Sequence, residues 1–195
     1  MGQPRRVVLA STSRYRKELL ERLAIRFETA APRCDETPLR GEAPADTALR
    51  LSVLKARAVA PRFARALIIG SDQVASSDGE VMGKPGNHAN AVRQLRALSG
   101  KSVDFHTAVA LLDTRTGKVQ KRVVLCRVRF RKLTRERIEA YLRREKPYDC
   151  AASAKAEGLG IALIERIETD DPTSLIGLPL IALSAMLERA GVKVV

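Results

Sequence analysis

Two long runs rich in β-branched and apolar residues, 102–112 and 119–131, are separated only by the polar connection "DTRTGK". Runs of this kind joined by a short turn are typical of two antiparallel strands. In the stretch "LCRVRFR" of the second run, apolar and basic residues alternate, which gives the strand one apolar and one basic face. We therefore expect a sheet that buries one face of this hairpin and exposes the other to water.

Helices and further strands interleave with this hairpin. Apolar periodicity predicts strands at 6–10, 66–70 and 161–167, and helices at 13–24, 47–60, 88–98, from Thr134 onward and at 178–191. Asp46 is a candidate N-cap of the second helix, and Asp78 with Gly79 predicts a hairpin turn. These elements predict a mixed α/β (α+β) fold, in which helices pack on a mixed central sheet. With 195 residues, the chain is expected to form one domain over residues 1–195.

The chain carries a formal charge of +13, so it attracts polyanions. Two kinds of partner fit this charge: nucleic acid, and a small, highly charged nucleotide held in a basic pocket. Arg127, Arg129 and Arg131 form either a nucleic-acid stripe or the ordinary wet face of an antiparallel sheet. Because only 4% of the residues are aromatic and none is Trp, platforms for stacking single strands are scarce. The composition therefore favours a small ligand, with no specific nucleic acid as partner.

Several classes of protein are disfavoured by local patterns. No run of about 18 apolar residues indicates a membrane span, and the apolar stretch near the N-terminus is shorter than the roughly 7 to 15 residues of a signal peptide. Cys34, Cys126 and Cys150 are too widely spaced for a zinc site or a disulfide framework, which favours the reducing cytoplasm. His88 and His106 lie in no recognisable nucleophile motif, so carboxylates and a metal ion are considered instead.

The stretch "LASTSRYRKELLERL" leads from an apolar strand into a leucine-rich helix through the hydroxyl residues 11–13. A helix that begins at such a junction points backbone N–H groups outward, and its dipole favours negative charge there. Phosphate is the expected ligand. The alternative is that Ser13 only caps the helix and that Arg14, Arg16 and Lys17 form its solvated face.

A candidate catalytic carboxylate lies in "IIGSDQV", where Asp72 is expected just beyond an apolar strand. The carboxyl ends of strands form the ligand crevice of open α/β sheets, although an Asp in this place is also a common turn residue. Lys55, Lys84, Asp35 and Glu36 are further candidates, each of which taken alone is typical of an ordinary surface charge.

Seven successive segments cover nearly the whole chain: "LASTSRYRKELLERL", "CDETP", "LRLSVLKARAVA", "IIGSDQV", "GKP", "LRALSG" with "HTAVAL", and "EGLGIALIERIETDDPTSLIGLPL". Their order and spacing resemble those of the Maf nucleotide pyrophosphatases. The resemblance implies a mixed α/β fold with a substrate cleft. It also implies hydrolysis of a nucleoside triphosphate to the monophosphate and pyrophosphate with a divalent cation, for which Mg²⁺, Mn²⁺ and Co²⁺ are candidates. The oligomeric state stays open, a homodimer included.

On this resemblance, four residues would hold the phosphates: Ser11, Arg16, Lys55 and Lys84. Glu36 and Asp72 would manage the metal and the attacking water, and Asp72 resembles the family's proton acceptor. Cleavage between the α- and β-phosphates needs neutralised charge, a metal ion and a water delivered in line, which agrees with these residue types. Because an aspartate is ordinarily a weak base near neutral pH, the metal would have to help by acidifying the water.

Three positions resemble the subgroup of the family that acts on 7-methyl-GTP: Tyr15, Gln73 and Glu157. In members that prefer dTTP and UTP, an arginine, a threonine and a glutamine resemble these positions in turn. Methylation at N7 makes guanine cationic, so an aromatic ring at Tyr15 could stack on it through a cation–π contact. Glu157 could accept hydrogen bonds from the N1–H and N2–H₂ donors of the guanine edge. The alternatives are a Tyr that packs at a core edge and a Glu that is merely solvated.

Two positions depart from the family's pattern. Arg14 stands where a proline usually follows the second serine, so the helix opens without a fixed φ. Ala152 stands where a glycine is typical and adds a Cβ where close approach or a positive φ can be required. Two other functions stay open: a pyrophosphatase for dTTP, UTP or a broad range of modified nucleotides, and a basic nucleic-acid-binding or septum-formation regulator that acts through its arginine face.

Overall fold

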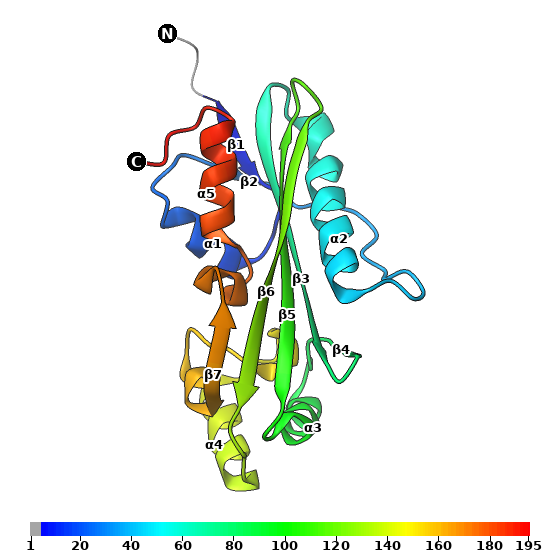
Figure 1. Cartoon of the computed structure of the whole chain (residues 1–195), viewed down its shortest axis with the longest axis vertical. Coiled ribbons are helices and arrows are strands. Elements are labelled where there is room, and N and C mark those ends of the chain that lie inside the picture. The colour runs from blue at the N-terminus through cyan, green and yellow to red at the C-terminus, as the bar shows by residue number, and fades with distance from the viewer. Residues whose placement is uncertain (1–4) are drawn as a thin grey trace. The chain divides into compact units, whose positions relative to one another are not determined.

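The computed structural model describes residues 5–195, which contain a seven-stranded sheet and five α-helices (Figure 1). The strands are β1 Arg6–Leu9, β2 Glu28–Thr29, β3 Ala66–Ser77, β4 Glu80–Met82, β5 Ser102–Asp113, β6 Val119–Phe130 and β7 Ile164–Thr169. The α-helices are α1 Arg14–Glu21, α2 Pro44–Val59, α3 His88–Leu98, α4 Arg135–Glu145 and α5 Leu180–Arg189. The 3₁₀ segments are η1 Ala60–Arg62, η2 Ala151–Ser153, η3 Leu159–Leu163 and η4 Pro172–Ile176. No helix within residues 5–195 combines the length and the hydropathy needed to cross a membrane.

The sheet is mixed, with the strand order β2-β1-β3-β5-β6-β7 and with β4 paired to β3. β1 runs parallel to both β2 and β3, whereas β4 is antiparallel to β3 and β7 is antiparallel to β6. β5 and β6 are neighbours joined by residues 114–118, and a connection this short makes the pair antiparallel. The predicted mixed α/β fold and its long hairpin are therefore confirmed.

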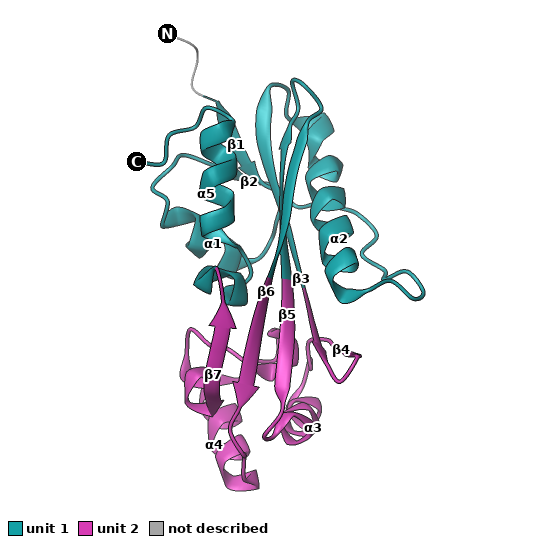
Figure 2. Cartoon of the chain, viewed as in Figure 1, with its two compact units in different colours: residues 1–73, 107–124, 171–195 teal, residues 74–106, 125–170 magenta. Residues whose placement is uncertain are grey.

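Two compact units divide the chain (Figure 2). Unit 1 holds the described residues up to Gln73 together with 107–124 and 171–195, and unit 2 holds 74–106 and 125–170. The boundary falls inside β3, β5 and β6, each of which is 12 residues long. Neither unit is a continuous stretch of sequence, and the expectation of one domain stays a prediction.

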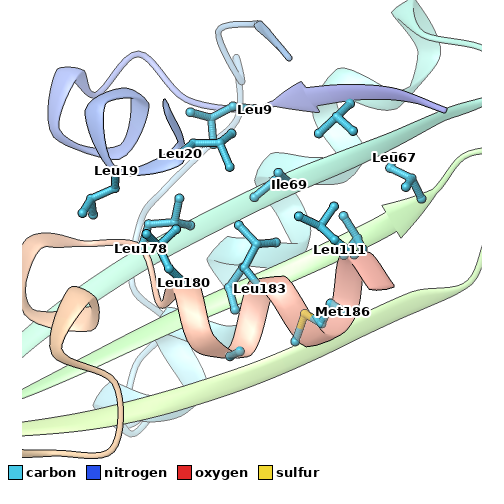
Figure 3. Packing of buried hydrophobic residues seen from close by; sticks show 14 residues of the cluster. Leu9, Leu19, Leu20, Leu67, Ile69, Leu111, Leu178, Leu180, Leu183 and Met186 are labelled. Carbon is cyan, nitrogen blue, oxygen red and sulfur yellow. The ribbon is translucent and has the colours of Figure 1, made fainter. Parts of the chain in front are cut away.

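The core of unit 1 follows from the two-residue period of its strands. Leu9 of β1 and Ile69 of β3 face a cluster that leucines of α1 and α5 complete (Figure 3). The alternate residues Val8 and Ile68 face a second cluster, to which α2 contributes. The paired segments of β1 and β3 are thus buried on both faces, which explains why they form continuous apolar runs in the sequence.

The structure corrects the length of the strand that carries Asp72. The sequence predicts an end near Gly70, but β3 continues to Ser77, so Asp72 lies inside the strand. Polar residues can continue a buried strand when each finds a hydrogen-bond partner. Ser71 does so by donating a 2.8 Å hydrogen bond to the carbonyl oxygen of Ala108 in β5.

Two other boundaries differ from those predicted. α2 begins at Pro44 with Ala43 as its N-cap, so Asp46 lies in the first turn and does not cap the helix. Proline is favoured at the first helical position because it has no N–H group to leave unpaired there. The strand expected at 161–167 begins only at Ile164, after the 3₁₀ segment η3.

Two local predictions are confirmed. Asp78 and Gly79 connect β3 to β4 and have φ angles of 51° and 84°, as a tight hairpin turn with two positive φ angles requires. Thr134 caps α4, since its hydroxyl accepts a 3.3 Å hydrogen bond from the backbone nitrogen of Arg137. Short polar motifs in the sequence therefore predicted the turn between β3 and β4 and the start of α4 correctly.

Gly70 allows α2 to approach β3 closely. A Cβ at this position would lie 2.0 Å from the backbone oxygen of Ser52 and 2.9 Å from the backbone nitrogen of Ala56, both in α2. Asp72 follows two residues later on the same face of the strand, and Lys55 lies between Ser52 and Ala56 along the helix. The glycine therefore sets the spacing across which Lys55 can reach Asp72.

We expect Gly70→Ala to destabilise the protein, because its methyl group would force α2 away from β3. Overpacking of this kind typically costs about 1–3 kcal/mol. Urea unfolding measures the change in the free energy of unfolding, and Gly83→Ala is the matched control because its Cβ would meet nothing within 4 Å. Equal stability of the Gly70→Ala variant and the parent would contradict the close approach.

The loop that carries Glu36 is tied to α2 through Glu42. Arg50 of α2 donates two hydrogen bonds of 2.7 Å to the Glu42 carboxylate, and Thr47 donates a third of 3.0 Å. The hydrogen bonds from Arg50 are the main cause that lowers the pKa of Glu42 to about 2. The folded state therefore favours the ionised carboxylate.

We expect this contact to stabilise the fold only while Glu42 is ionised. Because the folded-state pKa is below the ordinary value of 4.5, the contribution is complete above about pH 4.5 and is lost as the pH falls toward 2. Glu42→Gln should lower the free energy of unfolding at pH 7, and its difference from the parent should shrink between pH 4.5 and 2. Urea unfolding across this range tests the expectation, with Glu21→Gln as control because its pair with Lys17 is exposed. A difference that is the same at every pH would refute the linkage.

Candidate active site

A buried lysine bridges two carboxylates in unit 1. The Nζ atom of Lys55 lies 2.6 Å from Oδ1 of Asp72 and 2.6 Å from Oε2 of Glu36. Lys55 and Asp72 are only 5% and 7% exposed, whereas the Glu36 side chain is 50% exposed. Three of the predicted site residues, which come from α2, β3 and the loop before α2, are thus in direct contact.

Asp72 lies past the carboxyl end of a neighbouring strand rather than past the end of its own. The last residues paired between β1 and β3 are Leu9 and Ile69, so β3 continues beyond β1, and Asp72 belongs to that continuation. The chain that leaves β1 leads directly into α1. The expectation that Asp72 follows the end of its own strand is therefore wrong, because the strand end that it lies past is that of β1.

Arg16 of α1 is held close to the same carboxylates. Its Nε donates a 2.9 Å hydrogen bond to the carbonyl oxygen of Gly177, which also accepts a 2.9 Å hydrogen bond from Ser71. Gly177 has a φ of 123°, a conformation that residues with a side chain rarely adopt. Burial lowers the pKa of Arg16, while the charges of Asp72 and Glu36 act in the opposite direction. The guanidinium stays positively charged beside the acids.

Ser11 and Ser13 use their hydroxyl groups within the junction between β1 and α1. Oγ of Ser11 accepts a 3.1 Å hydrogen bond from the backbone nitrogen of Ser13, and Oγ of Ser13 accepts one of 3.4 Å from that of Arg16. Ser13 is therefore the N-cap of α1, as the alternative interpretation of this stretch expected. Phosphate binding by Ser11 stays a prediction.

Two of the three positions linked to base preference lie in unit 1. The guanidinium of Arg14 covers the ring of Tyr15, with its Cζ 4.7 Å from the ring centroid, and its Nη2 donates a 2.7 Å hydrogen bond to Tyr15 Oη. Gln73 is half-buried, and its Nε2 donates to Thr107 Oγ1 at 2.9 Å and to the carbonyl oxygen of Ser174 at 3.0 Å. Gln73 thus ties β3 to β5 and η4, and a role in base recognition stays a prediction for both residues.

Lys84 and Glu157 belong to unit 2, and both side chains are exposed. Lys84 follows β4, and Glu157 lies between η2 and η3. Their assigned roles stay predictions. In the same unit, Ala152 is fully buried with a φ of 55°, which confirms that the backbone has a positive φ at this departure from the family's pattern.

Glu36 and Asp72 fit a divalent cation that binds together with phosphates. Mg²⁺ is usually held by one or two carboxylates, with substrate phosphates and water completing its coordination. Each of these carboxylates places one oxygen against Lys55 and has a second oxygen to offer. Residues 5–195 contain no cluster of three or more His, Cys, Asp or Glu side chains that could hold a metal ion by themselves. Glu36 and Asp72 are therefore candidate ligands for a metal that binds together with the substrate, and this role stays a prediction.

The arginines of the basic run, two in β6 and Arg131 directly after it, have partners within unit 2. Arg127 donates hydrogen bonds of 2.7 and 2.8 Å to the two carboxylate oxygens of Asp104 in β5. Arg129 lies 3.8 Å from the carboxylate of Glu165, and Arg131 donates to a backbone carbonyl oxygen at 3.0 Å. This pairing favours the wet face of an antiparallel sheet over a stripe that binds nucleic acid.

Sequence reasoning missed two glycines that position the site. Gly70 brings α2 against β3, and a glycine inside an apolar strand is a recognised signal of close backbone approach. Gly177 anchors Arg16 across a sequence separation of 161 residues. No local pattern indicates a contact of that range, because it exists only after the sheet has formed.

Comparison with known proteins identifies close relatives of the chain. The sequence profile described as Maf-like protein matches residues 6–190. The chain is 58% identical to the 7-methyl-GTP pyrophosphatase of Burkholderia pseudomallei (strain 1710b) over 191 residues, which cover 96% of this chain and 89% of the relative. It is 55% identical to the 7-methyl-GTP pyrophosphatase of Albidiferax ferrireducens over 196 residues, which cover 100% of this chain and 98% of the relative.

Among solved structures, the Staphylococcus aureus Ham1 protein matches with a TM-score of 0.47 and 13% sequence identity, over 66% of this chain and 73% of that one. The family assignment rests instead on the sequence profile, which spans nearly all of the described residues, and on relatives that share more than half of their residues with the chain. The chain belongs to the Maf-like protein family.

Proposed function

We propose that the protein hydrolyses 7-methyl-GTP to 7-methyl-GMP and diphosphate. The observation that carries the proposal is the buried Lys55, whose Nζ lies 2.6 Å from both Asp72 and Glu36. The substrate follows from the relatives in Burkholderia pseudomallei and Albidiferax ferrireducens, which are named 7-methyl-GTP pyrophosphatase. Such an enzyme would remove a modified nucleotide from the pool, and the cytoplasm is the expected location.

The charges of this group suit a triphosphate. Lys55 and Arg16 supply two positive charges, and Asp72 and Glu36 supply two negative ones, so the group is balanced before the substrate binds. An arginine anchored through Nε still presents its two Nη groups, which bind phosphate oxygens as a pair. Ser11 and Lys84 are proposed as the further phosphate ligands.

Asp72 is proposed to accept the proton of the attacking water. Water attacks the α-phosphorus in line with the anhydride bond between the α- and β-phosphates. This bond breaks and diphosphate leaves, while Lys55 and Arg16 offset its negative charge. The Asp72 carboxylate takes the proton, and Lys55 holds this carboxylate in place through its Oδ1. A divalent cation bound at Glu36 and Asp72, for which Mg²⁺, Mn²⁺ and Co²⁺ are candidates, would acidify the water and neutralise phosphate charge.

Three residues are proposed to set the preference for the base: Tyr15, Gln73 and Glu157. Methylated guanine is cationic and would stack on the ring of Tyr15. The Arg14 guanidinium already covers one face of this ring, with its Cζ 4.7 Å from the centroid, so the base would stack on the opposite face. The exposed carboxylate of Glu157 would accept hydrogen bonds from the guanine edge.

We expect Asp72→Asn to reduce hydrolysis at least 100-fold, because an amide neither accepts the proton nor holds a metal ion as a carboxylate does; roughly this factor is typical for a general base. Diphosphate release from 7-methyl-GTP, GTP, UTP and dTTP with Mg²⁺, Mn²⁺ or Co²⁺ measures the reaction. Asp46→Asn is the control, because Asp46 is exposed in the first turn of α2.

Thermal unfolding separates a loss of chemistry from a loss of fold, since Asp72→Asn also leaves Lys55 without one partner of its buried ion pair. Near-normal turnover by a folded Asp72→Asn variant would overturn the mechanism. Orthophosphate as the only initial product would overturn the reaction itself, and a preference for UTP or dTTP would favour the alternative substrates.

We expect Glu157→Gln and Tyr15→Ala to separate the two parts of base recognition. Glu157→Gln removes a charge at constant shape and should lower kcat/KM for both 7-methyl-GTP and GTP by about 10- to 150-fold, the equivalent of about 1.5–3 kcal/mol for a charged hydrogen bond. Tyr15→Ala should affect 7-methyl-GTP more than GTP, because only the methylated base carries a fixed positive charge. Steady-state kinetics on 7-methyl-GTP, GTP and UTP test both variants. Equal losses on all three nucleotides would rule out base recognition at these positions.

A further inference from the structure

The segment that carries Glu157, residues 154–160, is fastened to α4 at its beginning. The backbone nitrogen of Lys155 donates a 3.1 Å hydrogen bond to Oη of Tyr141, and the same hydroxyl donates to the carbonyl oxygen of Ser153 at 3.1 Å. Tyr141 is only 5% exposed, and burial raises the pKa of its hydroxyl, which keeps the donated proton in place. The entrance to the segment is therefore fixed by a buried side chain of the helix.

A second residue of α4, Glu145, forms hydrogen bonds with the segment on both sides of Glu157. Oε1 of Glu145 lies 2.5 Å from Nζ of Lys155, and Oε2 accepts a 2.7 Å hydrogen bond from the backbone nitrogen of Leu159. The Glu145 side chain is 11% exposed. The hydrogen bond from Lys155, followed by that from Leu159, lowers the pKa of Glu145, so its carboxylate stays ionised at neutral pH.

The segment wraps closely around this carboxylate. A Cβ at Gly158 would lie 2.7 Å from Oε2 of Glu145, and a Cβ at Gly160 would lie 2.4 Å from the backbone oxygen of Lys155. That oxygen also accepts hydrogen bonds from the backbone nitrogens of Gly158 and Gly160, at 3.1 and 3.0 Å. Two glycines and one carboxylate thus hold the backbone on either side of Glu157 in a single tight turn.

We propose that Glu145 is a positioning residue for base recognition, which it serves by holding the backbone that presents Glu157. The inference rests on the proposed function, in which Glu157 accepts hydrogen bonds from the guanine edge. Glu157 is exposed, so the turn that carries its backbone limits where its carboxylate can lie. Displacement of a binding group by about 1 Å can cost on the order of 100-fold in rate, so a residue that never touches the substrate can decide the preference.

The test compares Glu145→Ala with the conservative variant Glu145→Gln on 7-methyl-GTP, GTP and UTP. Glu145→Ala should raise KM for the two guanine nucleotides at least about tenfold while kcat changes less, and UTP should be affected no more than about twofold. Glu145→Gln keeps an acceptor for the Leu159 nitrogen and should restore part of the lost preference. Gly158→Ala must displace the Glu145 carboxylate and should shift the preference in the same direction.

Glu139→Ala is the matched control. Glu139 also lies on α4 and also bonds outside its helix, to Nε2 of His88 at 3.0 Å, but among the residues described it forms no hydrogen bond or ion pair with the Glu157 segment. Its removal should change stability without changing the ratio of kcat/KM between 7-methyl-GTP and UTP. Thermal unfolding of every variant accompanies the kinetics, and Glu145→Gln and Gly158→Ala carry the test if Glu145→Ala does not fold.

The double variant Glu145→Ala/Glu157→Gln decides how Glu145 acts. If Glu145 works through Glu157, the double variant should show the same nucleotide preference as Glu157→Gln alone. Additive losses, or equal losses on guanine nucleotides and UTP, would overturn the positioning role. Loss of preference in Glu157→Gln with full preference in the Glu145 variants would overturn this inference alone. Unchanged preference in Glu157→Gln would instead overturn the base assignment in the proposed function, and this inference with it.

Discussion

Lys55 and Asp72 form an ion pair that is almost wholly removed from water, and the site in unit 1 is built around it. Breaking such a pair by removing one partner typically costs about 3–5 kcal/mol, because a buried charge is left without compensation. Gly70 lets the backbone of α2 approach β3 at the level of this pair, because a Cβ there would lie 2.0 Å from the backbone oxygen of Ser52.

Other contacts fix the positions of the charged side chains around this pair. Arg16 is anchored to Gly177, and Glu36 belongs to a loop that the Glu42–Arg50 pair ties to α2. The group has equal numbers of positive and negative charges, so in the proposed function a divalent cation bound with the substrate would offset part of the charge of the triphosphate.

The overall charge of +13 does not show which basic residues are paired within the fold. Arg127 and Arg129, which lie in the most conspicuous basic stretch of the sequence, face carboxylates across the sheet in unit 2. Glu145 and Lys155 form a pair in the same unit, where the charge fastens a turn instead of binding a ligand. Paired charges of this kind hold the geometry of the backbone and the sheet.

The sequence by itself determined those features that depend on neighbouring residues: the alternation that builds the long hairpin, the caps at Ser13 and Thr134, and the turn at Asp78 and Gly79. The sequence also identified the family, because the order and spacing of its motifs can be compared without knowledge of the fold.

Only the tertiary structure decided how far β3 extends, because polar residues in a strand are tolerated or excluded by partners such as Ala108 that lie elsewhere in the chain. The same holds for the contact of Lys55 with Asp72, the anchoring of Arg16 at Gly177 and the pairing of Arg127 with Asp104. Each of these contacts joins residues between 17 and 161 positions apart. Hydrogen bonds and ion pairs act over a few ångströms, so such partners are chosen by the packing of the sheet and its helices, which local sequence patterns do not encode.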